Sequence, residues 1–395
     1  MKILSIETSC DETGISILEG TDTVSILGNA LASQIDLHAQ YGGVFPAIAK
    51  RAHAEKFVPL LSEALTQAGM LADGKITVSD SAQELITKIQ EKESTLVESL
   101  IPFLQSHARP ELDYIAVTTG PGLEPALWVG INAARILSVI WDIPLIPINH
   151  MEGHILVTLL DKKSEKEFTL KELSFPALGL LVSGGHTELV LVHNYAKYEK
   201  IGATRDDAVG EAFDKVARML GLPYPGGPAI SRLAAEFRAS GATQEFEFPR
   251  PMMHSHDYDF SYSGIKTAVL YTIRDLGEIS DDQKKALACA FEDAAIEVLV
   301  SKTLKALEEY QVQTLIVGGG VAGNTYLRHE LTTAVQEKFK GTTVLFPEQW
   351  LATDNSVMIG IAAFVRTLHG SVEHISPENV KADGNLSITE GGYKK

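Results

Sequence analysis

The sequence predicts an α/β protein in which one arrangement of strands and helices occurs twice, once in each of two lobes. A strand, a turn and a returning strand occupy residues 2–18, and a second hairpin of this kind occupies residues 177–192. After each hairpin, strand and helix patterns alternate, as in layered α/β folds. The length of 395 residues exceeds what one hydrophobic core usually supports, which favours two lobes.

The first hairpin joins an apolar strand at residues 2–6 to a second strand at residues 15–18. The polar turn between them, residues 7–14, offers backbone N–H groups and hydroxyls at its tip. Such a tip can cradle a phosphate. A plain surface hairpin explains the pattern equally well.

A glycine-containing loop then precedes a helix that runs from about residue 46 to residue 69. Its residues Lys50, Arg51 and Lys56 form a basic cluster, which a solvated face also explains. Residues 72–110 read as an inserted amphipathic helix or helical hairpin, because apolar residues recur at close to 3.6-residue spacing. A packing or partner surface is the expected role of this insertion.

The remaining elements alternate. Strands are expected at residues 114–119, 144–148, 177–192 (a hairpin), 314–317 and 343–346, and helices at residues 125–140, 207–220, 281–309 and 356–369. The strand at residues 314–317 runs into a glycine-rich turn, an arrangement that suits a nucleotide. The polar tail from Ile375 onward is expected to pack loosely.

Two histidines follow the strand at residues 144–148. His150 and His154 are four residues apart, so on a helix they share one face about 6 Å apart and can hold one metal ion. A surface face or a packed core explains the spacing as well. In the zinc-peptidase pattern a glutamate directly follows the first histidine. Glu152 instead lies about 200° round the helix from His150 and points away from the pair.

Asp354 is the candidate third ligand, because it stands at a strand-to-helix junction, where ligands gather in open α/β sheets. An N-cap aspartate is an equally good local interpretation.

Composition restricts the partners. The chain has 51 acidic and 34 basic residues, a formal charge of −17, whereas proteins that bind nucleic acid through their whole surface are usually basic. Any RNA must therefore be bound through a local basic strip or with a partner. Two cysteines, Cys10 and Cys289, provide no disulfide framework and fit a reducing cytoplasm. The chain has no apolar run long enough to span a membrane and no signal-peptide pattern at its start.

Seven ordered segments together resemble the TsaD family, the tRNA N6-adenosine threonylcarbamoyltransferases of the actin/Hsp70/sugar-kinase superfold. These segments are residues 5–13, 150–154, 182–187, 210–215, 259–264, 319–324 and 353–355. The resemblance implies an actin-like ATPase fold with a nucleotide cleft between its lobes. It implies a first lobe of residues 1–147 and 355–395, and a second lobe of residues 148–354.

The resemblance also implies a site and a reaction. One divalent metal ion, Fe²⁺ in the first place and Zn²⁺ in the second, would be bound by His150, His154 and Asp354. Substrate-binding positions would be Leu181, Val182, Ser183, Gly184, Gly185, Asp214, Gly227 and Asn324. The reaction moves a threonylcarbamoyl group from threonylcarbamoyl-AMP to N6 of adenine 37 in tRNAs that read ANN codons. The expected partners are tRNA, TsaB-like and TsaE-like proteins and the synthase that makes the donor, with no membrane.

Because exocyclic N6 is a poor nucleophile, close placement of donor and acceptor should supply much of the rate. A nearby acid–base group is expected to take its proton, and Asp11 or Glu12 is the candidate. A solvated hairpin tip is the other interpretation of this pair.

Two departures from the family pattern stand out. Ala47 occupies a position where the family usually has glutamate, and the insertion at residues 72–110 replaces a short connection. The competing functions are a kinase-like enzyme or scaffold ATPase of the same superfold and, with less support, a zinc metallopeptidase.

Overall fold

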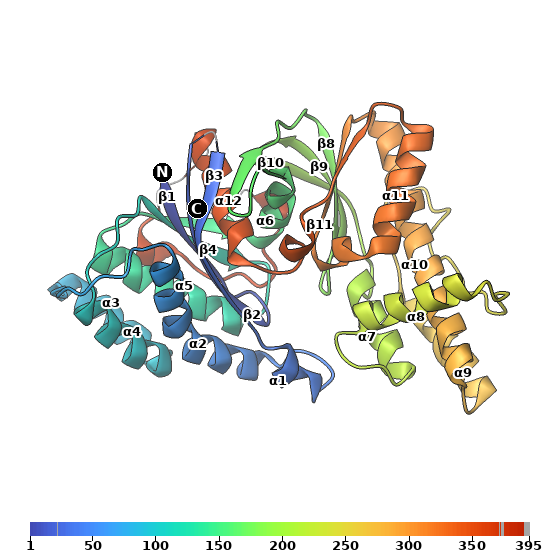
Figure 1. Cartoon of the computed structure of the whole chain (residues 1–395), viewed down its shortest axis with the longest axis horizontal. Coiled ribbons are helices and arrows are strands. Elements are labelled where there is room, and N and C mark those ends of the chain that lie inside the picture. Colours follow the sequence, from blue (N-terminus) through green and yellow to red (C-terminus); the bar gives the residue numbers. More distant parts are fainter. Residues whose placement is uncertain (22, 371, 373–374, 391–395) are drawn as a thin grey trace. The chain divides into compact units, whose positions relative to one another are not determined.

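The computed structural model describes residues 1–21, 23–370, 372 and 375–390, and the chain divides into two compact units (Figure 1). Unit 1 consists of residues 1–172 and 354–395, and unit 2 of residues 173–353. The sequence placed this boundary at residues 147 and 148. Residues 148–172 belong instead to unit 1, because they include β6 and β7, which extend its sheet.

The sheet of unit 1 has the strand order β5-β4-β1-β2-β3-β7-β6. Its strands are β1 (Lys2–Glu7), β2 (Glu12–Gly20), β3 (Thr23–Ser33), β4 (Tyr114–Gly120), β5 (Leu145–Asn149), β6 (Leu160–Lys162) and β7 (Glu167–Leu170). Strands β1, β4 and β5 are parallel, whereas β2 and β3 pair antiparallel as a continuation of the first hairpin.

The sheet of unit 2 has the order β10-β9-β8-β11-β12. Its strands are β8 (Ala177–Val182), β9 (Thr187–Asn194), β10 (Lys197–Ala203), β11 (Thr314–Gly318) and β12 (Thr343–Leu345). Two antiparallel pairs are followed by two parallel ones, which is the pattern of β3-β2-β1-β4-β5 in unit 1. The predicted duplicated α/β fold is therefore confirmed.

Helices cover both faces of the unit 1 sheet. They are α1 (Ile35–Ala39), α2 (Pro46–Gln67), α3 (Asp80–Gln90), α4 (Ser94–Ser106), α5 (Glu124–Trp141), α6 (His150–Leu156) and α12 (Ser356–Leu368). Leu4 and Ile6 of β1 belong to the core beneath α2 and α5. On the opposite face, α12 packs so closely that a Cβ on Gly360 would lie 2.9 Å from Ser5 Oγ. Because side chains alternate along a strand, Glu7 shares the α12 face with Ser5.

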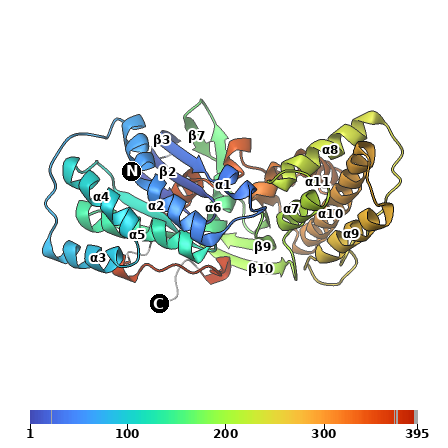
Figure 2. The ribbon, with the colours of Figure 1, turned by 90° about the horizontal axis from the view of Figure 1, so that it is seen from below.

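The insertion forms a helical hairpin, the second of the two expected forms. Helices α3 and α4 meet at residues 91–93 and pack beside α2 and α5, as Figure 2 shows. Leu96, Leu100 and Leu104 are buried on α4. Lys50, a member of the predicted basic cluster, forms an ion pair with the buried Glu93 at 2.9 Å. This lysine therefore joins α2 to the insertion.

Unit 2 contains α7 (Val209–Met219), α8 (Gly226–Ser240), α9 (Ser263–Leu276), α10 (Asp281–Tyr310) and α11 (Thr325–Lys338). Helix α10 begins with a capping box, in which Ser280 and Gln283 each bind the other's backbone N–H. Its buried face forms much of the core of this unit, together with β8, β9 and β11. Within the described residues, no helix is both long and apolar enough to cross a lipid bilayer.

Residues 375–390 of the C-terminal tail do not pack loosely, so this expectation is wrong for the described part of the tail. Val380 and Leu386 are buried, Asp383 N donates to Thr119 O at 2.9 Å and Gly122 N donates to Gly384 O at 3.1 Å. The tail carries too few apolar residues to show a periodic pattern. Those few are nevertheless enough to hold it against the loop after β4.

Candidate metal centre and substrate-binding turns

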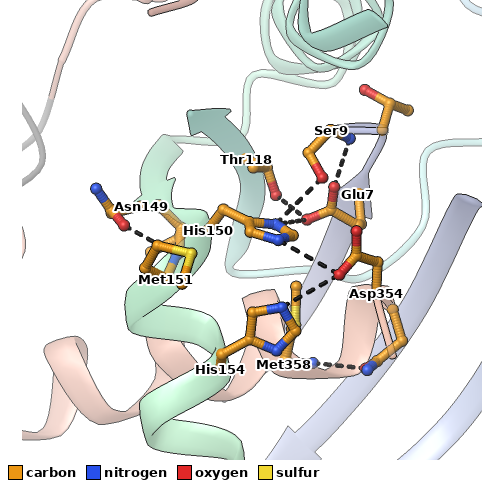
Figure 3. A network of polar contacts seen from close by, with 12 residues as sticks. Glu7, Ser9, Thr118, Asn149, His150, Met151, His154, Asp354 and Met358 are labelled. Atoms are coloured by element: carbon orange, nitrogen blue, oxygen red, sulfur yellow. Dashed lines mark hydrogen bonds and ion pairs between the residues drawn. The ribbon is translucent and has the colours of Figure 1, made fainter. Parts of the chain in front are cut away.

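His150, His154 and Asp354 converge in unit 1 (Figure 3). Asp354 Oδ1 lies 3.4 Å from His150 Nε2 and 3.1 Å from His154 Nε2. Each residue offers one ligand atom, and the three atoms lie within 4.8 Å of one another. The structure therefore brings together the three residues that the resemblance implied as metal ligands.

Two asparagines set where the ligand-bearing helices begin. Asn149 accepts hydrogen bonds from Met151 N and Glu152 N, which starts α6 at His150. Asn355 accepts from Met358 N and is the N-cap of α12. The alternative interpretation of Asp354 as an N-cap is therefore wrong, and its carboxylate faces the two imidazoles instead.

Glu7, which orients His150, is a functional residue that no motif in the sequence indicated. Its carboxylate is fully buried at the end of β1, accepts hydrogen bonds from Ser9 N and Thr118 Oγ1, and lies 3.1 Å from His150 Nδ1. A carboxylate that accepts from Nδ1–H leaves the lone pair of Nε2 free for a metal. The signal in the sequence was an acidic residue that ends an otherwise apolar strand.

The charges of this cluster depend on one another. Burial disfavours the charged form of His150, but Asp354 and Glu7 outweigh it and raise the pKa of His150 to about 10. Burial, together with the nearby His150, lowers the pKa of His154. The Asp354 pKa is lowered, because the two imidazoles outweigh the effect of burial. A metal ion would take the place of the proton on His150, since ligand nitrogens bind deprotonated.

The donor set fits a divalent metal ion. Two imidazole nitrogens and one carboxylate oxygen suit Fe²⁺, Zn²⁺ or Mn²⁺ and leave positions for substrate. The side chain of Asp354 is 21% exposed, so the set is open on one side. Glu152 does not face the pair, because its buried carboxylate binds Arg366 of α12 at 2.5 and 3.1 Å. Glu152 is therefore not placed to act as the general base of the zinc-peptidase pattern.

Asp11 and Glu12 lie at the tip of the β1–β2 hairpin, in the same unit as the metal centre. Burial and the neighbouring charges of Asp11 and Asp354 raise the pKa of Glu12 to about 10. The neighbouring Asp11 carboxyl thus contributes to this raised pKa, and Ser33 Oγ donates to Glu12 Oε1. This pair is partly enclosed, which argues against the solvated-tip interpretation.

The predicted substrate hairpin lies in unit 2. Leu181 and Val182 end β8 with fully buried side chains, so they can offer only backbone atoms. Ser183 Oγ accepts from Gly185 N and His186 N, which shapes the turn. Next to Gly184 and Gly185 the space for a Cβ is open. A ligand can therefore approach the backbone of this turn closely.

Three further predicted positions, Asp214, Gly227 and Asn324, also lie in unit 2. Asp214 Oδ1 accepts from Gly226 N at 2.7 Å and so fixes the start of α8, which carries Gly227. Asn324 is the N-cap of α11, and its amide also donates to Ser231 Oγ and Glu292 Oε1. Asp214 and Asn324 thus hold helix starts, where N–H groups favour an anionic ligand.

Most of the chain is similar to one known protein family. The model described as TsaD, tRNA N6-adenosine threonylcarbamoyltransferase, matches residues 25–78 and 91–361. The match is interrupted where α3 lies. The segment without a counterpart in that model is thus shorter than the expected insertion at residues 72–110.

The chain is also similar to a curated relative and to two solved structures. A tRNA N6-adenosine threonylcarbamoyltransferase from Nitrosospira multiformis is 40% identical over 394 residues, 99% of each chain. Full-length HypF in its phosphate- and nucleotide-bound form is 13% identical with a TM-score of 0.47, and the alignment covers 70% of this chain but half of HypF. A ROK hexokinase from Thermus thermophilus is 13% identical with a TM-score of 0.41, covering 94% of this chain and all of the hexokinase.

Proposed function

Because this chain belongs to the family of tRNA N6-adenosine threonylcarbamoyltransferases, we propose that it uses threonylcarbamoyl-AMP as donor and adenine 37 as acceptor. The acceptor would be a tRNA that reads ANN codons, and N6 of the adenine would attack the carbonyl of the donor as AMP departs. The observation that carries this proposal is the convergence of His150, His154 and Asp354 on one point.

The three ligand residues would hold one divalent ion, Fe²⁺ in the first place and Zn²⁺ in the second. When bound, such an ion acts as a Lewis acid that polarises a carbonyl or phosphoryl oxygen. Glu7 would fix the tautomer and direction of His150 through Nδ1. Ser9 and Thr118 would in turn hold the two oxygens of Glu7 in place.

Asp11 and Glu12 would serve as the acid–base pair. Two adjacent carboxyl groups that interact this strongly do not both ionise readily. The raised pKa of Glu12 keeps a proton on the pair at neutral pH. The remaining carboxylate would accept the proton that N6 loses as the new bond to carbon forms.

The turns of unit 2 would bind the nucleotide part of the donor. Backbone N–H groups of residues 181–185 would contact it, and the open space at Gly184, Gly185 and Gly227 allows close approach. Asp214 and Asn324 support this role by fixing the starts of α8 and α11.

The proposed partners are those that the resemblance to the family implies. We propose that the chain works in the cytoplasm, where tRNA is modified, with TsaB-like and TsaE-like proteins and a synthase that supplies threonylcarbamoyl-AMP. The net charge of −17 supports a need for partners in binding tRNA.

Removal of one ligand tests the proposal. We expect His150→Ala, His154→Ala and Asp354→Ala each to lose the bound metal and to reduce transfer at least about 100-fold, since each ligand contributes to one site. Metal content would be measured by elemental analysis, and transfer with donor, tRNA and partner proteins, with and without chelator.

A surface histidine provides the control. His193 pairs with Glu199 in unit 2, so His193→Ala should retain metal and activity. Full transfer activity in any of the three ligand variants, or in chelated wild-type protein, would refute the metal-centred mechanism. Activity that needs only Mg²⁺ and a nucleoside triphosphate would favour the kinase-like alternative.

A further inference from the structure

A second buried polar network lies beside the β1–β2 hairpin. Its residues have no assigned role in the proposed function. Its centre is His53 on α2, whose ring is fully buried. His53 Nε2 lies 3.0 Å from Cys10 O, and His53 Nδ1 lies 2.7 Å from Thr13 Oγ1. The imidazole thus bridges two points of the turn that carries Asp11 and Glu12.

The partners of His53 define its tautomer. A carbonyl oxygen only accepts, so Nε2 must carry the hydrogen that binds Cys10 O. Nδ1 then accepts from the Thr13 hydroxyl and from Gln34 Nε2, which lies 3.3 Å away. Burial lowers the pKa of His53 although the carboxylates of Glu7 and Asp11 favour its protonation, and His38 opposes protonation as well. The ring is therefore neutral at physiological pH.

Gln34 holds the other side of Asp11. Its backbone N donates to Asp11 O at 2.9 Å, and its side-chain Oε1 accepts from His38 Nε2 at 3.1 Å. Gln34 itself is buried. The carbonyl groups of Cys10 and Asp11, one before and one after the Asp11 side chain, are thus both fixed by buried partners.

We propose that His53 and Gln34 are positioning residues for the Asp11–Glu12 carboxyl pair. Because the peptide units on both sides of Asp11 are held, the directions of the Asp11 and Glu12 side chains are held with them. A displacement of about 1 Å in a reacting group can cost about 100-fold in rate. The proposal rests on the proposed function, which assigns acid–base work to this pair.

Two substitutions of His53 distinguish the effect of its hydrogen bonds from the effect of its side-chain volume. His53→Phe fills the space but removes both ring nitrogens, and it should lower kcat about 10- to 100-fold. KM for the donor and for tRNA should change no more than about 3-fold. His53→Gln keeps an amide N–H that can reach Cys10 O, and it should recover kcat to within about 5-fold of wild type. Metal content should stay unchanged in both variants.

A double-mutant cycle links the effect to the carboxyl pair. If His53 acts through Glu12, the combined variant His53→Phe/Glu12→Gln should be no slower than Glu12→Gln alone. Fully additive losses, or an unchanged kcat in His53→Phe, would overturn the proposal. Full activity of both Asp11→Asn and Glu12→Gln, or an inactive wild type, would instead refute the proposed function.

Cys10 provides a readout that does not depend on transfer. Its thiol is partly buried at the hairpin tip, and Cys289 is the other cysteine of the chain. In a Cys289→Ala background, His53→Phe should raise the rate of Cys10 labelling by a maleimide about 10-fold, because local opening exposes the thiol.

The matched control is Ser138→Ala, which removes one buried hydrogen bond, from Ser138 Oγ to Ile143 O, at the end of α5. It should leave Cys10 labelling and kcat at wild-type values. Equal labelling rates in wild type and His53→Phe would overturn the proposal. So would an equal rise in the Ser138→Ala control.

Discussion

At the candidate metal centre, His150 lies between two carboxylates. Glu7 faces Nδ1 and Asp354 faces Nε2, so the ring has little freedom to rotate. The buried Glu7 carboxylate is itself held by Ser9 and Thr118. Individual side chains thus determine which nitrogen of His150 is available to a metal. The β1–β2 turn carries both Ser9 and the carboxyl pair Asp11 and Glu12.

The Glu12 carboxyl leads to a prediction about stability and pH. Its pKa is raised to about 10 in the folded protein, so between pH 4.5 and 10 the folded state binds more protons than the unfolded state. Stability attributable to this group is therefore lost as pH rises through that range. Glu12→Gln removes the free-energy cost of keeping this carboxyl protonated, so its free energy of unfolding should exceed that of wild type by about 1–3 kcal/mol at pH 8. Urea unfolding from pH 5 to pH 9 would measure this difference.

An exposed glutamate serves as the control for this measurement. Glu98 on α4 is exposed, so Glu98→Gln should show no gain that grows with pH. A constant or falling difference between Glu12→Gln and wild type would show that Glu12 is ionised in the folded protein. The same substitution should slow transfer, which would make Glu12 a residue that trades stability for function.

At the level of elements, α6 has seven residues and carries both histidine ligands. A helix this short is not stable by itself. It is held by the Asn149 cap at its start and by the buried ion pair between Glu152 and Arg366 of α12. Arg366 also donates to Pro147 O, so one side chain joins α12 to α6 and to the strand before it.

Breaking this ion pair should therefore loosen the metal centre. Arg366→Met leaves the Glu152 carboxylate buried without its partner, and we expect a loss of about 3–5 kcal/mol in the free energy of unfolding. Metal affinity should fall as well, because α6 loses its anchor. Both would be measured by denaturant titration and by metal competition with a chelator.

Two further variants give this experiment its controls. Glu152→Gln/Arg366→Met removes the buried charge and should recover part of the stability lost in Arg366→Met. Lys88→Met breaks the exposed Lys88–Glu84 pair and should cost less than about 0.5 kcal/mol. A loss in Arg366→Met no larger than in Lys88→Met would contradict the role of the pair.

At the level of the whole molecule, a duplicated fold carries an acidic surface. One arrangement of five strands occurs in both units, and the formal charge is −17. In unit 1 the predicted basic cluster is partly neutralised within the chain, because Lys50 pairs with Glu93 and Arg51 with Glu55. Few basic groups of this helix are therefore left for the phosphates of an RNA.

We accordingly expect the isolated chain to bind tRNA weakly. The Kd should fall in the range of about 1–100 μM that is typical of non-specific contacts, and it should tighten when TsaB-like and TsaE-like partners are added. Fluorescence anisotropy with labelled tRNA at 50–200 mM salt would measure both. Nanomolar binding by the chain alone, with a steep dependence on salt, would contradict this expectation.

Local sequence determined the parts of this protein that depend on neighbours along the chain. The spacing of His150 and His154 placed both rings on one face of a helix, and the position of Glu152 correctly turned it away from them. The two hairpins with small-residue turns indicated the duplicated fold, because strand period and turn chemistry are local properties. Seven short segments were sufficient for the family.

Only the tertiary structure decided what depends on contacts between distant segments. Asp354 lies 200 residues from His154, and local sequence could not distinguish a metal ligand from an N-cap at this position. The structure shows that Asn355 is the N-cap of α12. The roles of Glu7 and His53 depend on β1, β2, α2 and α6 packing together. The expectation of a loosely packed tail is wrong for residues 375–390, because a few apolar side chains pack against the rest of unit 1 without any periodic pattern. Burial and long-range pairing assign these residues their chemistry, and neither is encoded in local spacing.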